Sequence, residues 1–170
     1  MWLSLLLSFV CANGMHLYLL HSQRNDRKMS ISYHAVHSRK TYIVYILGHF
    51  FGGLFFLIFA YRLFYVEFGS ETLWTISVLG VVSEWIQAIT PAKNKYEIYH
   101  LVAAWSMALF MSILLFVSPI VAKDMAALMV AIATFLTSAV LLVDLKKQKF
   151  WIPQITFFLL FFAVMTLLAI

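Results

Sequence analysis

Ionisable side chains stand inside parts of this chain that are otherwise apolar. His16, His49 and Glu84 each lie within a long apolar segment, and His100 opens another. Because ionisable groups are costly in a hydrocarbon environment, their presence there indicates a functional site. Imidazole and carboxylate groups can exchange protons, ligate a metal ion or, as two histidines, hold a haem. Any chemistry of this chain is therefore expected to involve these four residues.

Six apolar segments carry these side chains, and each is close to the ~20 residues that a transmembrane helix needs. They lack the alternation of apolar and polar residues found in barrel strands, so their backbone groups must be satisfied within helices. The sequence predicts an all-α, polytopic integral membrane protein, a six-helix bundle forming a single transmembrane domain over residues 1–170. The predicted helices cover residues 2–20, 42–66, 72–90, 99–118, 125–143 and 150–170, and the fourth is expected to end at Pro119.

The composition excludes an ordinary soluble domain. Hydrophobic residues make up 64% of the chain and charged residues 11%, against about 25% charged residues in soluble domains. The single cysteine, Cys11, excludes an intrachain disulfide. The first apolar segment is interpreted as a retained helix, because no positive charge precedes it.

The basic residues are distributed unevenly among the predicted loops. Ten of the twelve Lys and Arg residues follow the first, third or fifth helix, and short loops rich in Lys and Arg stay in the cytoplasm. The sequence therefore predicts a cytoplasmic basic loop over 21–41, with both termini on the non-cytoplasmic side. This asymmetry explains the net charge of +5 without a nucleic-acid partner.

The ionisable residues are predicted to lie at similar depths. At ~1.5 Å per residue from the cytoplasmic helix ends, His16 lies about 7 Å deep, Glu84 about 9 Å and His49 about 10 Å. His100 lies about 2 Å deep by the same measure. The predicted polar intramembrane site in the cytoplasmic half consists of His16, His49, Glu84, Gln87 and His100, with Asn13, Tyr45 and Ser77 as supporting neighbours.

Helical spacing predicts which faces meet. On the helix 72–90, a stripe at steps of three and four is expected to face its neighbours, and the residues beside it to face elsewhere. On the helix 42–66, Gly48 and Gly52 have the spacing that lets another helix approach closely beside His49. Such spacing also occurs where two helices pack together without any further function. Asn13 and Gln87 could likewise serve only as hydrogen-bonding groups between helices. The stripe is Ser77, Gly80, Glu84 and Gln87, and the residues expected to face elsewhere are Val81, Val82 and Trp85.

The long basic loop is predicted to lie on the membrane surface. Its segment 29–37 is too short to span, and we expect Ile31, Ala35 and Val36 to insert into the interface. Its basic side chains are expected to contact anionic lipid headgroups, in addition to the lipid bilayer itself. These residues are Arg24, Arg27, Lys28, Arg39 and Lys40.

The segment from Ile89 to Ala104 resembles a pattern in a broad group of small six-helix membrane proteins. Ile89-Thr90-Pro91-Ala92 is followed by His100 and the small residues Ala103 and Ala104. The group includes the DRAM-type autophagy modulators, the related GPI-anchor remodelling proteins and many uncharacterised prokaryotic relatives. The resemblance implies a six-span helical fold and a role for His100, and it implies no particular reaction.

Three functions agree with these residues. The first, which we favour over enzymology, is transport or proton-coupled handling of a small solute or ion, with a homo-oligomer lining any pore. The second is a membrane-embedded enzyme or redox protein: zinc held by His16, His49, Glu84 and His100 would act on a lipid, or His16 and His49 would ligate a haem. The third is an accessory or scaffold subunit in which the polar groups only fix helix pairing.

Overall fold

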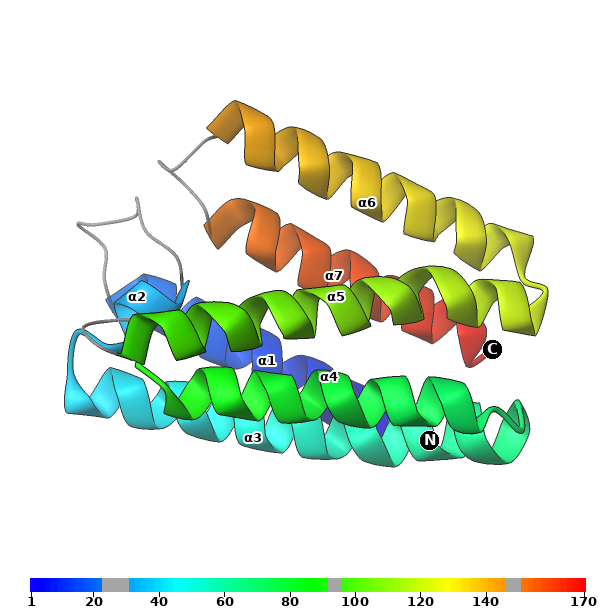
Figure 1. Ribbon diagram of the computed structural model, residues 1–170, viewed down its shortest axis with the longest axis horizontal. Coiled ribbons are helices and arrows are strands. Elements are labelled where there is room, and N and C mark those ends of the chain that lie inside the picture. Colours follow the sequence, from blue (N-terminus) through cyan, green and yellow to red (C-terminus); the bar gives the residue numbers. More distant parts are fainter. Residues whose placement is uncertain (23–30, 92–95, 146–150) are drawn as a thin grey trace.

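The computed structural model describes residues 1–22, 31–91, 96–145 and 151–170, and the regular elements in these ranges are all helices (Figure 1). The predicted all-α fold is therefore confirmed for the described part of the chain. The elements are α1 (Trp2–Ser22), α2 (Ile31–Ala35), α3 (Arg39–Ala60), the π-helix η1 (Tyr61–Glu67), α4 (Glu71–Ile89), α5 (Glu97–Ala122), α6 (Met125–Leu145) and α7 (Trp151–Leu168).

The six long helices run along the long axis of the molecule (Figure 1). The most extensive packing is between α4 and α5, between α1 and α3, and between α6 and α7. We call the end where α1 stops at Ser22 and α3 begins at Arg39 the basic end, because Arg39 and Lys40 are exposed there. Both termini lie toward the opposite end, which we call the terminal end (Figure 1).

Within the described residues, five helical stretches are long and apolar enough to cross a membrane: α1, α3 continued by η1, α4, α5 and α7. The helix α6 is also apolar, over the shorter stretch Met125–Leu141. Large apolar side chains point outward, and Leu3, Leu17, Trp105 and Met129 are each about two-thirds exposed. Such an apolar exterior is compatible with an integral membrane protein, because lipid would cover it.

The helix ends correct two sequence-based boundaries. The helix α5 continues through Pro119 to Ala122, whereas the sequence predicted that it ends at the proline. A proline this close to a helix end removes only one backbone hydrogen bond, so the last turn survives. The chain then reverses at Lys123, which has the left-handed φ of 56°. The helix α3 begins three residues earlier than predicted, because Ser38 and Thr41 form a capping box.

The sequence predicted that apolar side chains of the segment 29–37 insert into the membrane interface. In the structure, the apolar side chains of the short helix α2 are instead buried in the bundle. Ile31 and Ala35 are only 3% and 0% exposed, and they pack inside the bundle. The backbone N–H of Ile31 also donates to Oε1 of Gln154 on α7, at 3.3 Å. The interior offers α2 the same apolar contacts as an interface and adds this hydrogen bond.

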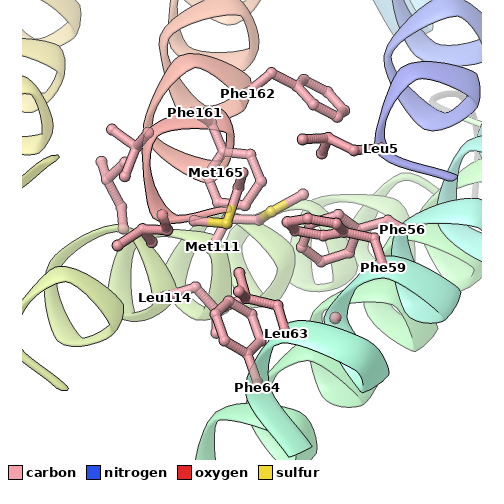
Figure 2. Close-up of a cluster of buried hydrophobic side chains, with 14 of the residues drawn as sticks. Leu5, Phe56, Phe59, Leu63, Phe64, Met111, Leu114, Phe161, Phe162 and Met165 are labelled. Carbon is pink, nitrogen blue, oxygen red and sulfur yellow. The ribbon is translucent and has the colours of Figure 1, made fainter. Parts of the chain in front are cut away.

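Two apolar clusters lie on either side of His49 and Glu84. The larger cluster occupies the terminal half of the bundle, where Phe56, Phe59, Phe64, Phe161 and Met165 interdigitate (Figure 2). The smaller cluster lies at the basic end and includes the buried side chains of α2. Along α3 and α4, His49, Glu84 and Gln87 fall between these clusters. The smaller cluster is Met15, Leu19, Ile31, Ala35, Tyr45 and Ala88.

Candidate functional site

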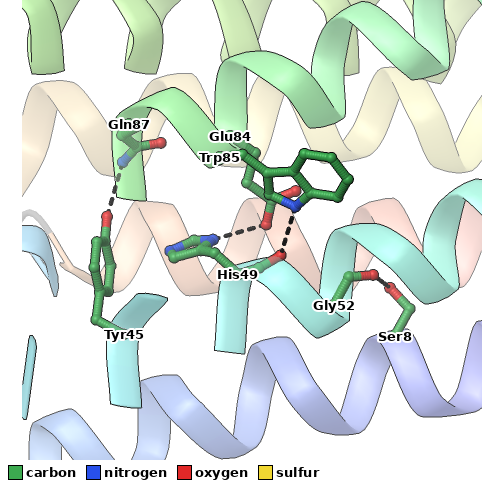
Figure 3. Close-up of polar contacts among 7 residues, drawn as sticks. All are labelled: Ser8, Tyr45, His49, Gly52, Glu84, Trp85 and Gln87. Atoms are coloured by element: carbon green, nitrogen blue, oxygen red, sulfur yellow. Dashed lines mark hydrogen bonds and ion pairs between the residues drawn. The ribbon is translucent and has the colours of Figure 1, made fainter. Parts of the chain in front are cut away.

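A buried histidine and a buried glutamate form the centre of the site. Nδ1 of His49 on α3 lies 2.7 Å from Oε1 of Glu84 on α4 (Figure 3). Their side chains are 4% and 6% exposed, respectively. This distance is at the short end for a nitrogen–oxygen hydrogen bond, as found when one partner is charged. The two residues therefore form a close pair that can hold a proton between them.

The close approach of α3 to α4 depends on Gly53, one turn beyond His49. A Cβ atom at this position would lie 2.7 Å from both Nε1 of Trp85 and Cγ1 of Val81. Only a glycine fits there without a shift of the neighbouring atoms. This contact also corrects a prediction, because Val81 and Trp85 face α3 rather than away from it. A packed helix uses a face wide enough to include residues on both sides of a polar stripe.

A second polar contact joins the same two helices. Nε2 of Gln87 donates to the hydroxyl of Tyr45 at 3.1 Å (Figure 3). The ring of Tyr45 also packs edge-on against the ring of His49, with 4.4 Å between centroids. Tyr45 precedes His49 by one helical turn, as Glu84 precedes Gln87. The antiparallel helices α3 and α4 are thus joined by two adjacent polar contacts.

The helix α1 brings a second histidine to the pair. A Cβ atom on Gly48 would lie 2.6 Å from Cβ of Met15, so α1 is the helix that approaches the Gly48 and Gly52 face closely. Ser8 strengthens the crossing by donating its hydroxyl to the carbonyl of Gly52 at 2.8 Å (Figure 3). This crossing brings the ring of His16 to a centroid distance of 6.2 Å from the ring of His49.

Two small cavities border the pair. One, of about 20 Å³, lies toward the basic end, beside His49. The other, of about 10 Å³, borders Glu84 and is lined mainly by apolar side chains such as Phe56, Met111 and Phe162. A cavity needs about 10–15 Å³ to hold one water molecule. The spaces beside the pair are therefore the size of single water molecules. The residues that line the larger cavity include His16, Ile31, Tyr45, His49, Gln87 and Gln154.

Among the described residues, the titratable side chains that face the pair come from α1 and α3. His16 on α1 and Tyr45 on α3 both touch the ring of His49. The side chains of α5 and α7 that line the two cavities are Met107, Met111, Gln154, Phe158 and Phe162, and none of these is titratable. On the side of α5 and α7, the side chains that line the cavities are therefore non-ionisable, and Gln154 is the polar one among them.

His100 contacts the end of α4 rather than the pair. Its Nδ1 lies 3.0 Å from the carbonyl oxygen of Gln87 and 2.8 Å from that of Thr90. Since carbonyl oxygens only accept, Nδ1 carries the proton and donates to both. His100 therefore satisfies the last turn of α4 and fixes α5 against it.

The supporting residues predicted from the sequence separate into two groups. Tyr45 belongs to the site, as described above. Asn13 donates to the carbonyl of Phe9, and Ser77 donates to the carbonyl of Leu73, so each bonds to its own helix. Of the predicted headgroup contacts, Arg39 and Lys40 are exposed at the basic end. Arg24, Arg27 and Lys28 lie outside the described residues.

The site geometry does not favour a metal or haem. Within the described part of the chain, no three His, Cys, Asp or Glu side chains come together in a way that could hold a metal ion. His16, His49, Glu84 and His100 are therefore not arranged as a zinc site. The rings of His16 and His49 meet beside a cavity of about 20 Å³, whereas cofactor pockets measure about 300 Å³ or more.

Sequence reasoning missed three contributors to the site. Ser8 and Trp85 were not recognised, because serine and tryptophan are common in membrane helices and their partners are backbone carbonyls. Gly53 could have been found, since it follows Gly52 directly and gives α3 small residues on two faces.

Comparison of the chain with protein-family models, with curated proteins and with solved structures finds no match. The resemblance of the segment around Pro91 and His100 to the six-helix group stays a prediction. The function must therefore be argued from the geometry of the site.

Proposed function

We propose that this chain is a six-span integral membrane protein in which the His49–Glu84 pair binds and releases a proton within the membrane. The observation that carries the proposal is the 2.7 Å contact between Nδ1 and Oε1 of two buried ionisable side chains. In a membrane helix, such groups are retained despite their cost, and they mark proton relays or ion pathways. The sixth span would be α6, with lipid covering its outer face.

A proton is the species that best fits the available space. The cavities on either side of the pair have volumes of about 20 and 10 Å³, so neither admits a solute larger than water. A proton needs no open pore, because it moves between hydrogen-bonded groups. Passage of a larger solute would need a conformational change, or a homo-oligomer with a pore between its chains.

The arrangement supports access from the basic end. The polar side chains of His16, Tyr45 and Gln87 lie on that side of the pair. Toward the terminal end, the next buried side chains are those of the large apolar cluster around Phe56 and Phe161, and Figure 2 shows how that cluster packs. If the basic residues lie in the cytoplasm, the proton reaches the pair from the cytoplasm, and both termini lie on the other side.

Proton uptake by liposomes tests the proposal. Purified protein is reconstituted with an entrapped pH-sensitive dye, and a potassium gradient with valinomycin sets the potential. We expect the wild-type protein to acidify the lumen faster than empty liposomes, and Glu84→Gln and His49→Asn to abolish the difference. Ser83→Ala is the matched control, because Ser83 adjoins Glu84 but donates only to its own helix. Equal uptake by the wild type and both site variants would overturn the proposal.

A scaffold function is the second candidate. The observation that favours it is that the polar contacts His49–Glu84 and Tyr45–Gln87 both join α3 to α4. If these contacts only fix helix pairing, Glu84→Gln lowers the thermal stability and changes no proton uptake. The liposome assay and a melting curve of the same preparation therefore separate the two functions.

A further inference from the structure

Two residues that line the larger cavity each carry a buried polar atom with no partner among the described residues. Nδ1 of His16 and Oε1 of Gln87 make no hydrogen bond to any residue that the structure describes. Both residues line the cavity of about 20 Å³, and they are only 2% and 5% exposed. Buried polar atoms are almost always satisfied by protein or by ordered water. The two atoms therefore indicate a ligand in this cavity.

The hydrogen bonds already present define what the ligand must offer. Gln87 uses Nε2 to donate to the Tyr45 hydroxyl, so its Oε1 is left as an acceptor. The Tyr45 hydroxyl accepts that bond and still has its own hydrogen to donate. In a neutral imidazole protonated at Nε2, Nδ1 of His16 is a second acceptor. Gln87, Tyr45 and His16 thus present two acceptors and one donor to a ligand.

We propose that this cavity binds one water molecule, which donates to His16 and Gln87 and accepts from Tyr45. Three hydrogen bonds are typical of a buried water, and a volume of about 20 Å³ exceeds the 10–15 Å³ that one water requires. The second cavity differs, because its lining is mainly apolar and its volume is about 10 Å³. The water site is therefore on the His49 side of the pair.

The water also explains how a proton reaches the pair, a step that rests on the proposed function. His49 lines the same cavity and uses Nδ1 for Glu84, so Nε2 is the nitrogen left to exchange a proton with the water. When the water has gained a proton from the basic side, it passes one proton to Nε2 of His49. The Nδ1 proton then moves to Oε1 of Glu84, and the water is neutral again.

Hydroxyl-radical footprinting detects such a water, because radicals made from bound water by an X-ray pulse oxidise the adjacent side chains. The protein is irradiated in lipid nanodiscs, and oxidation is read by mass spectrometry. Tyr45 is the reporter, and Phe161 is the control, because both are aromatic and almost fully buried. We expect Tyr45 to be oxidised well above Phe161. Equal, background oxidation of both would overturn the water site.

Variants test the predicted ligands of the water. The double variant His16→Leu/Gln87→Leu removes both acceptors and should reduce Tyr45 oxidation to the level of Phe161. Ser77→Ala is the matched control: Ser77 is buried on the same face of α4 as Gln87 but bonds to its own helix, so oxidation should be unchanged. A melting curve of each variant verifies that the bundle is intact. Unchanged Tyr45 oxidation in a folded double variant would overturn the assignment of these two ligands.

The failure of this inference can be distinguished from failure of the proposed function. Proton uptake that needs Glu84 without Tyr45 oxidation would reject the water site and leave the function in place. Tyr45 oxidation with uptake that is independent of Glu84 would reject the function and leave the water site. Wild-type uptake in the folded double variant would reject the water as the route to His49.

Discussion

Trp85 donates its indole N–H to the backbone carbonyl of His49 at 3.3 Å. The neighbouring residue Glu84 contacts the ring of the same histidine (Figure 3). Two consecutive residues of α4 therefore hold both the main chain and the side chain of His49. This double contact requires the backbones of α3 and α4 to approach closely, which makes their crossing the part of the fold that positions the site.

Replacing Gly53 by alanine should disrupt this crossing. The new Cβ atom would lie 2.7 Å from Nε1 of Trp85 and from Cγ1 of Val81, so these side chains or the helices must shift. We expect a loss of about 1–3 kcal/mol in the free energy of unfolding. Thermal or denaturant unfolding in detergent measures it. Gly14→Ala is the control, because a Cβ atom there meets nothing within 4 Å, and it should be neutral or slightly stabilising. Equal stability of the two variants would contradict the packing argument.

A double-mutant cycle on His49 and Glu84 should give a large coupling energy. The two side chains are buried at 4% and 6% exposure and are 2.7 Å apart, so removing either one leaves the other unpaired. Hydrogen bonds to charged groups contribute about 1.5–3 kcal/mol, and we expect a coupling free energy in that range. The cycle uses His49→Leu, Glu84→Leu and the double variant, each measured by unfolding in detergent. Additive effects of the two substitutions would show that the contact contributes nothing to stability.

The sequence was sufficient to predict the helices and the convergence of the central residues. Long apolar segments leave the backbone little alternative to a helix, and counting residues along each helix put His16, His49 and Glu84 at similar depths. The sequence was not sufficient to predict which side chains pack where two helices cross. Val81 and Trp85 adjoin the polar stripe, and whether they face α3 depends on the rotation of α4 about its axis. That rotation is set by Gly53 on the other helix.

The sequence also could not predict which of two possible environments a segment occupies. The apolar residues of α2 suit a membrane interface and a bundle interior equally well, so composition does not distinguish the two. In the structure, α2 lies inside the bundle, where it contacts α1 and α3 and where the N–H of Ile31 donates to Gln154. The partners of His100 could not be predicted from the sequence either. Its partners are carbonyls at the end of α4, which every helix end presents.

Replacing His100 by alanine should loosen the junction between α4 and α5. Nδ1 of His100 donates to the carbonyls of Gln87 and Thr90, so the variant leaves two carbonyl oxygens at the end of α4 without this partner. With a net value of about 1 kcal/mol per hydrogen bond, we expect a loss of about 1–2 kcal/mol in unfolding free energy. His100→Asn, which keeps a side-chain N–H donor, should recover part of it. Identical stability of wild type and His100→Ala would contradict the capping role.

Removing the side chain of Gln154 should release the start of α2. Oε1 of Gln154 accepts the N–H of Ile31 at 3.3 Å, and this contact ties α2 to α7 over the cavity beside His49. A net hydrogen bond of about 1 kcal/mol corresponds to about fivefold in an equilibrium constant. We therefore expect Gln154→Ala to raise the amide exchange rate of Ile31 about fivefold, read by hydrogen–deuterium exchange in nanodiscs. Thr166→Ala is the control, because Thr166 on the same helix bonds only to the carbonyl of Phe162. Unchanged exchange at Ile31 in Gln154→Ala would mean that the apolar contacts of Ile31 and Ala35 alone hold α2 in place.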